Sequence, residues 1–362
     1  MTEIRMVDLN GQYLRIKSEV DSAIQSVIDS TAFINGKEVQ EFATSLSNYL
    51  DGAHVIPCAN GTDALQIAMM ALGLKAGDEV ILPAHTYVAT AEVIALLGLT
   101  PVFVDVDSDT FNIDVSQIEG KITNKTKAIV PVHLYGQCAD MDPITAIAKK
   151  HKMFVIEDAA QSIGARYKDV FSGTIGHVGT TSFFPTKNLG CFGDGGAMIT
   201  RDAEFAEQLK MIANHGQKKK YHHEMVGVNS RLDTVQAAVL NVKLKYLADY
   251  ERRRNEVANY YDKHLSGVVI PVRSRNSTHV FHQYTIKAQR RDELKTFLQQ
   301  KGIPTIIYYP VPLHRQKAYF HDKSFPVTEQ LSKEVLSLPI HTEMTEEQLS
   351  YICETIADFY NG

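Results

Sequence analysis

The chain has 362 residues, of which 44% are hydrophobic and 22% charged. This composition argues against a disordered protein and allows either one large globular domain plus a smaller one or two domains of comparable size. The net charge of −5 argues weakly against nucleic-acid binding, and we interpret the cationic run "QKKKY" at 217–221 as a solvated loop. The four cysteines are far apart and no apolar run approaches a signal peptide or membrane span, so we expect reduced thiols, no metal site and a cytoplasmic protein.

Amphipathic helices are predicted near the start of the chain, at residues 13–30 and 36–51. Short apolar runs then alternate with helical patterns, and there are seven of them: 54–59, 79–84, 100–106, 127–133, 153–159, 178–184 and 195–200. These runs are continuously apolar, which indicates burial on both faces and hence a mostly parallel seven-stranded sheet between helices. The predicted fold class is α/β.

From Asp233 the pattern becomes that of one long helix, 233–265, which we expect to lead into a C-terminal part. That part combines apolar runs at 281–288 and 303–310 with helices at 291–302 and 345–362, which indicates a smaller α+β domain. We therefore expect a large domain, with the N-terminal helices, over residues 1–245 and a small domain over 246–362.

Parallel sheets bind ligands at the carboxyl ends of their strands, so the residues that follow each apolar run are candidates for a site. After the first run, Gly61 and Thr62 begin a helix, whose free N–H groups and dipole favour an anion such as phosphate. An ordinary turn and helix cap, with Asn60 as the capping residue, is the more common explanation of this stretch taken alone.

Two ionisable residues suggest a specific chemistry. Asp158 ends the run 153–159, so its carboxylate is expected at the sheet rim facing the cleft, with Glu157 on the opposite side; capping a following helix is the alternative role. Lys187 stands in "SFFPTK", just before a glycine-rich stretch. An amine against an apolar wall loses its proton more easily, so Lys187 can attack an aldehyde and form a Schiff base.

Pyridoxal phosphate needs this combination: a Schiff-base lysine, a carboxylate for its ring nitrogen, an anion site and an aromatic cover. Tyr87, which follows the second apolar run, can supply the cover, although a lone tyrosine at a strand end is more often part of the core. The residues therefore predict pyridoxal phosphate as the cofactor.

Seven motifs in chain order resemble those of the nucleotide-sugar aminotransferases, which are vitamin B6 enzymes of the aspartate-aminotransferase fold. They span nearly the whole chain and include "CANGTDALQIAMMALG", "VIEDAAQSIGA", "SFFPTKNLGCFGDGGAM" and "GVNSRLD". The resemblance implies that Lys187 carries the cofactor as a Schiff base and that the large domain binds it. It also implies that Asp158 and Gln161 contact the ring nitrogen and the phenolic oxygen.

The resemblance further implies how the phosphate is held. Gly61, Thr62 and Ser182 match phosphate contacts of the family. Asn229 matches an asparagine that reaches the phosphate of the neighbouring subunit, which implies a homodimer with shared active sites. A helix cap at Asn229 or Ser230 is the local alternative.

Within this family the motifs look most like those of enzymes that aminate the 3-keto carbon of UDP-2-acetamido-2-deoxy-ribo-hexuluronic acid. That step leads to bacterial surface polysaccharides such as the O-antigen of lipopolysaccharide. Arg231 is then expected to hold a uronate or donor carboxylate, with an ion pair to Asp233 as the alternative. Tyr308, where a histidine is expected in near relatives, Tyr309 and His314 are the other expected substrate contacts.

The implied reaction moves an amino group from L-glutamate to a UDP-linked keto-sugar and leaves 2-oxoglutarate. An aminotransferase for a dTDP-linked 3-keto- or 4-keto-6-deoxyhexose is an alternative. Relatives that dehydrate sugars carry a histidine in place of the lysine, and a non-catalytic regulator or binding module would be expected to lose Lys187 or Asp158. Because both residues are present, the sequence favours an aminotransferase.

Overall fold

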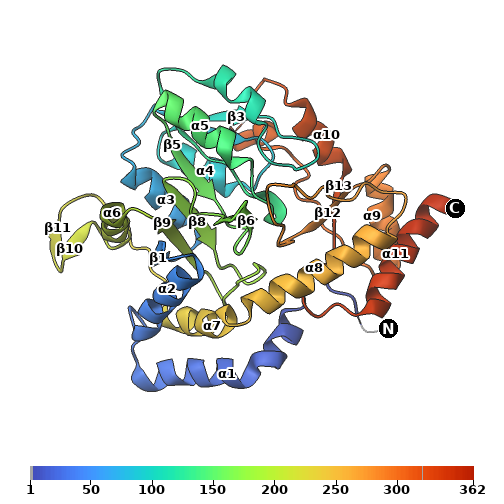
Figure 1. The fold of residues 1–362 in the computed structure, drawn as a ribbon, viewed down its shortest axis with the longest axis horizontal. Coiled ribbons are helices and arrows are strands. Elements are labelled where there is room, and N and C mark those ends of the chain that lie inside the picture. The colour runs from blue at the N-terminus through green and yellow to red at the C-terminus, as the bar shows by residue number, and fades with distance from the viewer. Residues whose placement is uncertain (1–2, 320) are drawn as a thin grey trace.

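The computed structural model describes residues 3–319 and 321–362. Its larger part is built on one sheet, in the order β1-β9-β8-β5-β4-β2-β3 (Figure 1). The strands are β1 (His54–Cys58), β2 (Glu79–Pro83), β3 (Thr100–Val104), β4 (Thr126–Ile129), β5 (Phe154–Asp158), β8 (Val178–Ser182) and β9 (Gly196–Thr200). Only β9 runs antiparallel to its neighbours, which confirms the expected mostly parallel seven-stranded sheet.

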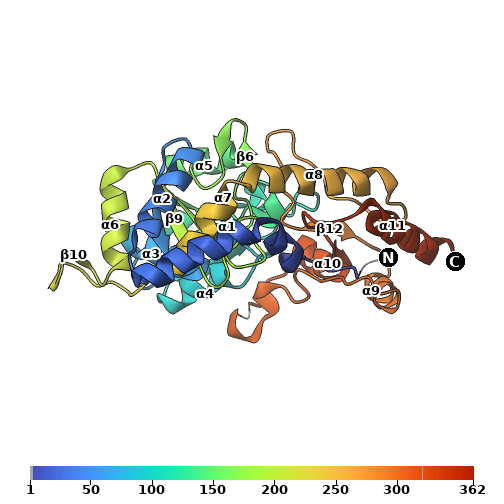
Figure 2. The same cartoon turned by 90° about the horizontal axis from the view of Figure 1, so that it is seen from below.

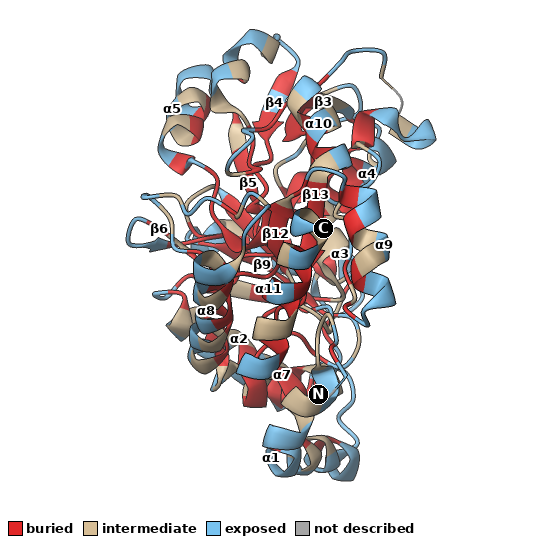
Figure 3. Cartoon of the chain, turned by 90° about the vertical axis from the view of Figure 1, so that its right-hand side faces the viewer, coloured by how far each residue is buried: buried red, intermediate tan, exposed pale blue. Residues whose placement is uncertain are grey.

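Helices cover both faces of this sheet, as the continuously apolar strands require. They are α2 (Lys37–Tyr49), α3 (Gly61–Ala71), α4 (Ala89–Leu96), α5 (Met141–His151), α6 (Ala203–Ala213) and α7 (Thr234–Leu244), and α1 (Leu9–Ser30) packs on the outside of α7. Successive residues of β2 show the alternation: Val80 and Leu82 pack with α3 and α4, whereas Ile81 packs with α5. The strands are therefore buried between layers of partly exposed helices (Figure 3).

The predicted long helix at 233–265 is two helices, because α7 ends at Leu244 and α8 (Leu247–His264) begins after a short break. At this break, the Lys245 amine lies 3.1 Å from a carboxylate oxygen of Glu19, and the Tyr246 hydroxyl also bonds Glu19 on α1. No glycine or proline stands there, so the chain turns through its packing against α1. Helix α8 then runs to the C-terminal part (Figure 1).

The C-terminal part is the smaller α+β unit that the sequence predicts. It contains β12 (Tyr284–Lys287), α9 (Arg291–Gln300), α10 (Pro326–Glu334), β13 (Val335–Leu338) and α11 (Glu346–Asn361). Strand β12 pairs with β13, whereas the apolar run 303–310 makes a single bridge, between Ile306 and Ser337. Two prolines in this run lack an N–H donor, so it cannot extend the ladder.

The domain boundary at residue 245 stays a prediction, and contacts cross it: Ile4 packs into the hydrophobic core of the C-terminal part, and Asn188 donates to the Val280 carbonyl at 2.9 Å. Two minor pairs of strands lie outside the main sheet, β6 (Arg166–Tyr167) with β7 (Val170–Phe171), and β10 (Gln217–Lys219) with β11 (His222–His223). The cationic run is thus an exposed hairpin that projects beyond α6, rather than a loop (Figure 2). In the part of the chain that is described, no helix has both the length and the apolar character needed to cross a bilayer.

Candidate active site

A cavity of about 610 Å³ opens where the strands of the main sheet end. Most of the residues singled out in the sequence line it, although they come from segments far apart in the chain. Those lining it are Gly61, Thr62, Tyr87, Asp158, Gln161, Ser182, Lys187, Tyr308 and Tyr309. The carboxyl ends of the parallel strands therefore gather these side chains in one place.

One end of the cavity has the chemistry of an anion site. Helix α3 begins at Gly61, and its cap Asn60 accepts a hydrogen bond of 2.8 Å from the Asp63 N–H. Asn60 is therefore the expected helix cap, and the same stretch also lines the cavity. Ser182, at the end of β8, lines the same space. A Cβ at residue 61 would lie 2.8 Å from the Ser182 Cβ, so the glycine keeps this space open.

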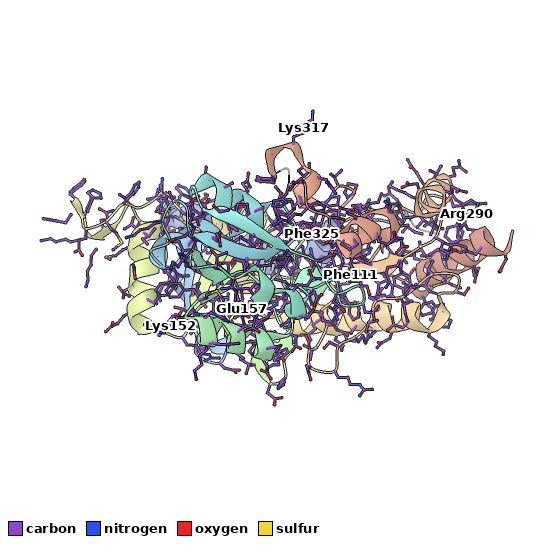
Figure 4. All side chains as sticks on the ribbon, turned by 90° about the horizontal axis from the view of Figure 1, so that it is seen from above. Phe111, Lys152, Glu157, Arg290, Lys317 and Phe325 are labelled. Atoms are coloured by element: carbon purple, nitrogen blue, oxygen red, sulfur yellow. The ribbon has the colours of Figure 1, made fainter. Side chains whose placement is uncertain are left out.

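Asp158 and Glu157 point to opposite sides of β5, as strand geometry requires. The buried Asp158 carboxylate lines the cavity and accepts hydrogen bonds from the Thr90 hydroxyl, at 2.8 Å, and the Ala160 N–H, at 3.2 Å. No helix begins after β5 until α6, so Asp158 does not cap one. Glu157 is buried within the larger part, 2.8 Å from His133 (Figure 4).

Lys187 lies in the loop between β8 and β9 and is partly buried on the cavity wall. Burial lowers the pKa of its amine to about 8, and the Asp158 carboxylate acts in the opposite direction. A much larger fraction of this amine is neutral near pH 7 than of an ordinary lysine. A neutral amine is the form that attacks an aldehyde.

Gln161 lines the cavity, and two hydrogen bonds hold its amide group. Its Oε1 accepts a hydrogen bond of 2.8 Å from the Tyr135 N–H, and its Nε2 donates to the Tyr309 hydroxyl at 3.3 Å. The ring centroids of Tyr309 and Tyr87 are 6.1 Å apart. The side chain of Tyr87 is more than half exposed, so Tyr87 is not part of the core. Donors and an aromatic wall thus face the space beside Asp158.

The cavity also contains residues that sequence reasoning missed. His282 and Gln283 line it from the segment just before β12. Burial, and then the charges of Lys187 and Arg254, hold the pKa of His282 well below its usual range, so this ring is neutral. The polar pair directly ahead of an apolar strand was a signal in the sequence that could have identified His282 and Gln283. No local signal marked Thr90, which contacts the site through Asp158.

Three predicted site residues, Asn229, Arg231 and His314, do not line this cavity. Arg231 borders a different groove, together with Ser230 and residues of α2 and α6, and Asn229 is exposed beside them. In the described part of the chain, the side chains of Asn229 and Arg231 have no hydrogen bond or ion pair, and Ser230 accepts from the Ala59 N–H at 3.1 Å. His314 is fully buried, 3.0 Å from Glu329.

The residues fit pyridoxal phosphate, which has an anionic phosphate, a basic ring nitrogen, a phenolic oxygen and an aldehyde. The start of α3 with Ser182 suits the phosphate, and the Asp158 carboxylate suits a protonated ring nitrogen. The donor Nε2 of Gln161 suits the phenolic oxygen, and the Lys187 amine suits the aldehyde. Each polar group of the cofactor therefore has a complementary group in one cavity.

Comparison with known proteins gives a consistent result. The model of the DegT/DnrJ/EryC1/StrS aminotransferase family matches residues 14–357. The chain is 47% identical to the UDP-2-acetamido-2-deoxy-3-oxo-D-glucuronate aminotransferase of Pseudomonas aeruginosa, over 98% of this chain and 100% of that one. It is 44% identical to a UDP-N-acetyl-3-dehydro-alpha-D-glucosamine 3-aminotransferase of Acidithiobacillus ferrooxidans, over 100% and 99% of the two chains.

A protein of Geobacillus stearothermophilus described as a pleiotropic regulatory protein is 48% identical, over 99% of this chain and 98% of its own. Among solved structures, an aminotransferase of this family from Brucella abortus has a TM-score of 0.96 at 44% identity, covering 99% of this chain and 100% of that one. NtdA of Bacillus subtilis, solved with bound pyridoxamine phosphate, has a TM-score of 0.90 at 33% identity, covering 95% and 82%.

Proposed function

The chain belongs to the DegT/DnrJ/EryC1/StrS family of pyridoxal-phosphate-dependent sugar-nucleotide aminotransferases, and from this we propose that it aminates C3 of a UDP-linked 3-keto sugar. The preferred substrate is UDP-2-acetamido-2-deoxy-ribo-hex-3-uluronic acid, with L-glutamate as amino donor. The proposed enzyme works in the cytoplasm, in the synthesis of a bacterial surface polysaccharide. The observation that carries the chemistry is the partly buried Lys187 in one cavity with Asp158 and the start of α3.

The names of two relatives support the choice of sugar. Both relatives act on a UDP sugar with a 3-oxo group, and they differ in whether the sugar is a uronate. Tyr308 lines the cavity at the position where the family resemblance leads us to expect a histidine. A phenol stays neutral where an imidazole can gain charge, so Tyr308 bears on the choice between these sugars.

When bound, pyridoxal phosphate supplies an aldehyde that takes up the amino group and a ring that withdraws electrons from the reacting carbon. Lys187 would hold this aldehyde, and its amine would move a proton at the Cα of the donor, as general base and acid. Asp158 would keep the proton on the ring nitrogen, while Gly61, Thr62 and Ser182 would hold the phosphate and Tyr87 would cover the ring.

The charge of the cavity supports a site shared between two subunits. Its described lining residues include three carboxylates, of Asp63, Asp158 and Asp194, but Lys187 is the only lysine or arginine. A cofactor phosphate, a diphosphate and a uronate together need more positive charge than one chain provides. We infer a homodimer in which the partner subunit's Arg231 and the partner subunit's Asn229 complete each site.

His314, which the family resemblance implied as a substrate contact, has a different role in this proposal. Its ring is fully buried against Glu329 and Phe325, at 3.0 Å from a Glu329 oxygen and 4.7 Å between ring centroids. We infer that it supports the segment that follows Tyr308 and Tyr309, and that it acts on the substrate only through that segment.

Turnover with defined substrates tests the proposal. The purified protein is mixed with L-glutamate and, separately, with the UDP-3-keto uronate, UDP-3-keto-N-acetylglucosamine and dTDP-linked 3-keto- and 4-keto-6-deoxyhexoses. We expect the highest kcat/KM with the uronate. A preference for a dTDP sugar would overturn the substrate, and the absence of turnover with every sugar and of pyridoxamine phosphate formation with L-glutamate would favour a regulator.

A further inference from the structure

We propose that Thr90 is a positioning residue that fixes the orientation of the Asp158 carboxylate toward the cofactor ring. The inference rests on the proposed function, in which Asp158 holds the proton on the ring nitrogen. Thr90 lies in the first turn of α4, is fully buried, and donates from its hydroxyl to Oδ2 of Asp158 at 2.8 Å. It is not a lining residue of the cavity, so it acts through Asp158.

The backbone of Asp158 is already fixed by the sheet. Its N–H donates to the Pro131 carbonyl at 2.9 Å, and its own carbonyl accepts from the His133 N–H at 3.0 Å. The side chain still has its terminal torsion, which in aspartate is broad and close to two-fold. Without further contacts, the carboxylate plane could therefore turn relative to a bound ring.

Two donors remove this freedom. Thr90 bonds Oδ2, and the Ala160 N–H bonds Oδ1 at 3.2 Å, so a rotation of the carboxylate would break both contacts. A carboxylate has about four lone-pair directions, so one on each oxygen remains for a ligand. Because Asp158 lines the cavity, the remaining directions include the one available to the ring nitrogen.

The placement of Thr90 also links the carboxylate to the aromatic cover. Tyr87 and Thr90 belong to one short segment, in which Tyr87 lines the cavity and Thr90 faces the sheet. A threonine hydroxyl in a helix commonly bonds back to a preceding carbonyl. In Thr90 the hydroxyl instead joins α4 to the end of β5.

The test uses Thr90→Val, which keeps the shape but removes the donor, and Thr90→Ser, which keeps the donor. Thr355→Val is the matched control, because the Thr355 hydroxyl is also buried but donates to the Tyr351 carbonyl within α11. Each full-length protein is prepared without cofactor and loaded with pyridoxal phosphate or with N-methyl pyridoxal phosphate. In the second compound the positive charge of the ring nitrogen is permanent, so it does not depend on Asp158.

Two quantities are measured for each protein: the Kd of the cofactor and the rate at which L-glutamate converts the loaded protein to its amino form. With pyridoxal phosphate, we expect Thr90→Val to bind the cofactor about tenfold more weakly than wild type and to react with L-glutamate about tenfold more slowly. With the N-methyl compound, the two proteins should agree within about twofold, because the oriented contact is absent from both. Thr90→Ser and Thr355→Val should stay within about threefold of wild type with either cofactor.

Three results would overturn the inference. Thr90→Val could keep the affinity and rate of wild type, it could lose affinity and rate equally with both cofactors, or Thr90→Ser could lose as much affinity and rate as Thr90→Val. An equal loss of affinity and rate with both cofactors would mean that Thr90 only stabilises the fold. If wild type binds the cofactor but does not react with L-glutamate, the proposed function fails, and the comparison of Kd values still decides the role of Thr90.

Discussion

Asp158 and Lys187 line the same cavity because Asp158 ends β5, Lys187 follows β8, and these two strands are adjacent and parallel in the sheet. In the chain the two residues are separated by a further pair of short strands and their turns. The sheet therefore places a carboxylate and a partly neutral amine on one cavity.

Removal of the Lys187 amine should abolish turnover. Lys187→Ala is expected to lower kcat by at least about a thousandfold, because it removes both the nucleophile and the proton carrier. Borohydride reduction of the wild-type protein loaded with pyridoxal phosphate, followed by peptide mass spectrometry, should locate the cofactor on Lys187. Attachment at another lysine would contradict the assignment.

The lowered pKa of Lys187 predicts a specific pH dependence. Its amine must be neutral to react, so the rate at which the cofactor-free protein attaches pyridoxal phosphate should rise with pH and level off above pH about 8. An unburied lysine would give a rise that continues toward pH 10.5. The rate is followed by absorbance after rapid mixing, with Lys187→Ala as the control that lacks the reaction.

Replacement of the Asp158 charge should slow the reaction but keep the cofactor bound. Asp158→Asn cannot hold the proton of a protonated ring nitrogen, so kcat is expected to fall by about a hundredfold or more. Cofactor retention is checked by absorbance after gel filtration. A nearly normal kcat would mean that Asp158 has only a structural role.

The space beside Gly61 should be necessary for binding phosphate. In Gly61→Ala the added Cβ would lie 2.8 Å from the Ser182 Cβ, so either the start of α3 or the end of β8 must move. We expect the Kd for pyridoxal phosphate to rise by about tenfold, measured by titration of the cofactor-free protein. Gly120→Ala is the matched control, because nothing lies within 4 Å of a Cβ built there.

Sharing of the site between subunits predicts rescue of one inactive variant by another. When Lys187→Ala and Arg231→Ala proteins are mixed and re-formed, random pairing gives about half heterodimers, each with one intact site. About a quarter of wild-type activity per site is then expected. Absence of rescue, when mass spectrometry shows that heterodimers are present, would place Arg231 in the site of its own chain.

Much of the fold could be predicted because the apolar runs carry the signal themselves. All seven runs in the first part of the chain form strands of the main sheet, and the motif around Lys187 lies on the expected cavity. The break before α8 could not be predicted, since it depends on contacts with Glu19 more than 220 residues away and on no local glycine or proline.

In the site, too, local sequence signals reveal some residues and not others. Lys187, Asp158 and Gly61 occur in sequence contexts that suggest chemistry, whereas Thr90 is an ordinary residue of an apolar helix. Its contact joins α4 to the end of β5 across 68 positions of the chain, and only the folded arrangement reveals it. In the described chain Asn229 is exposed and Arg231, partly buried, borders a second groove, and the contribution of both to a partner's site stays a prediction.

The neighbouring carboxylates at the end of β5 make this strand unusually sensitive to insertions and deletions. Glu157 faces inward, where its two oxygens accept from His133 and from the N–H groups of Gly173, Ile175 and Gly176, while Asp158 faces the cavity. Loss of one residue within β5 would exchange the two sides, because side chains alternate along a strand. The inner network would then hold the shorter carboxylate and the cavity the longer one. Variation among proteins descended from this one should therefore replace residues in β5 without changing their number.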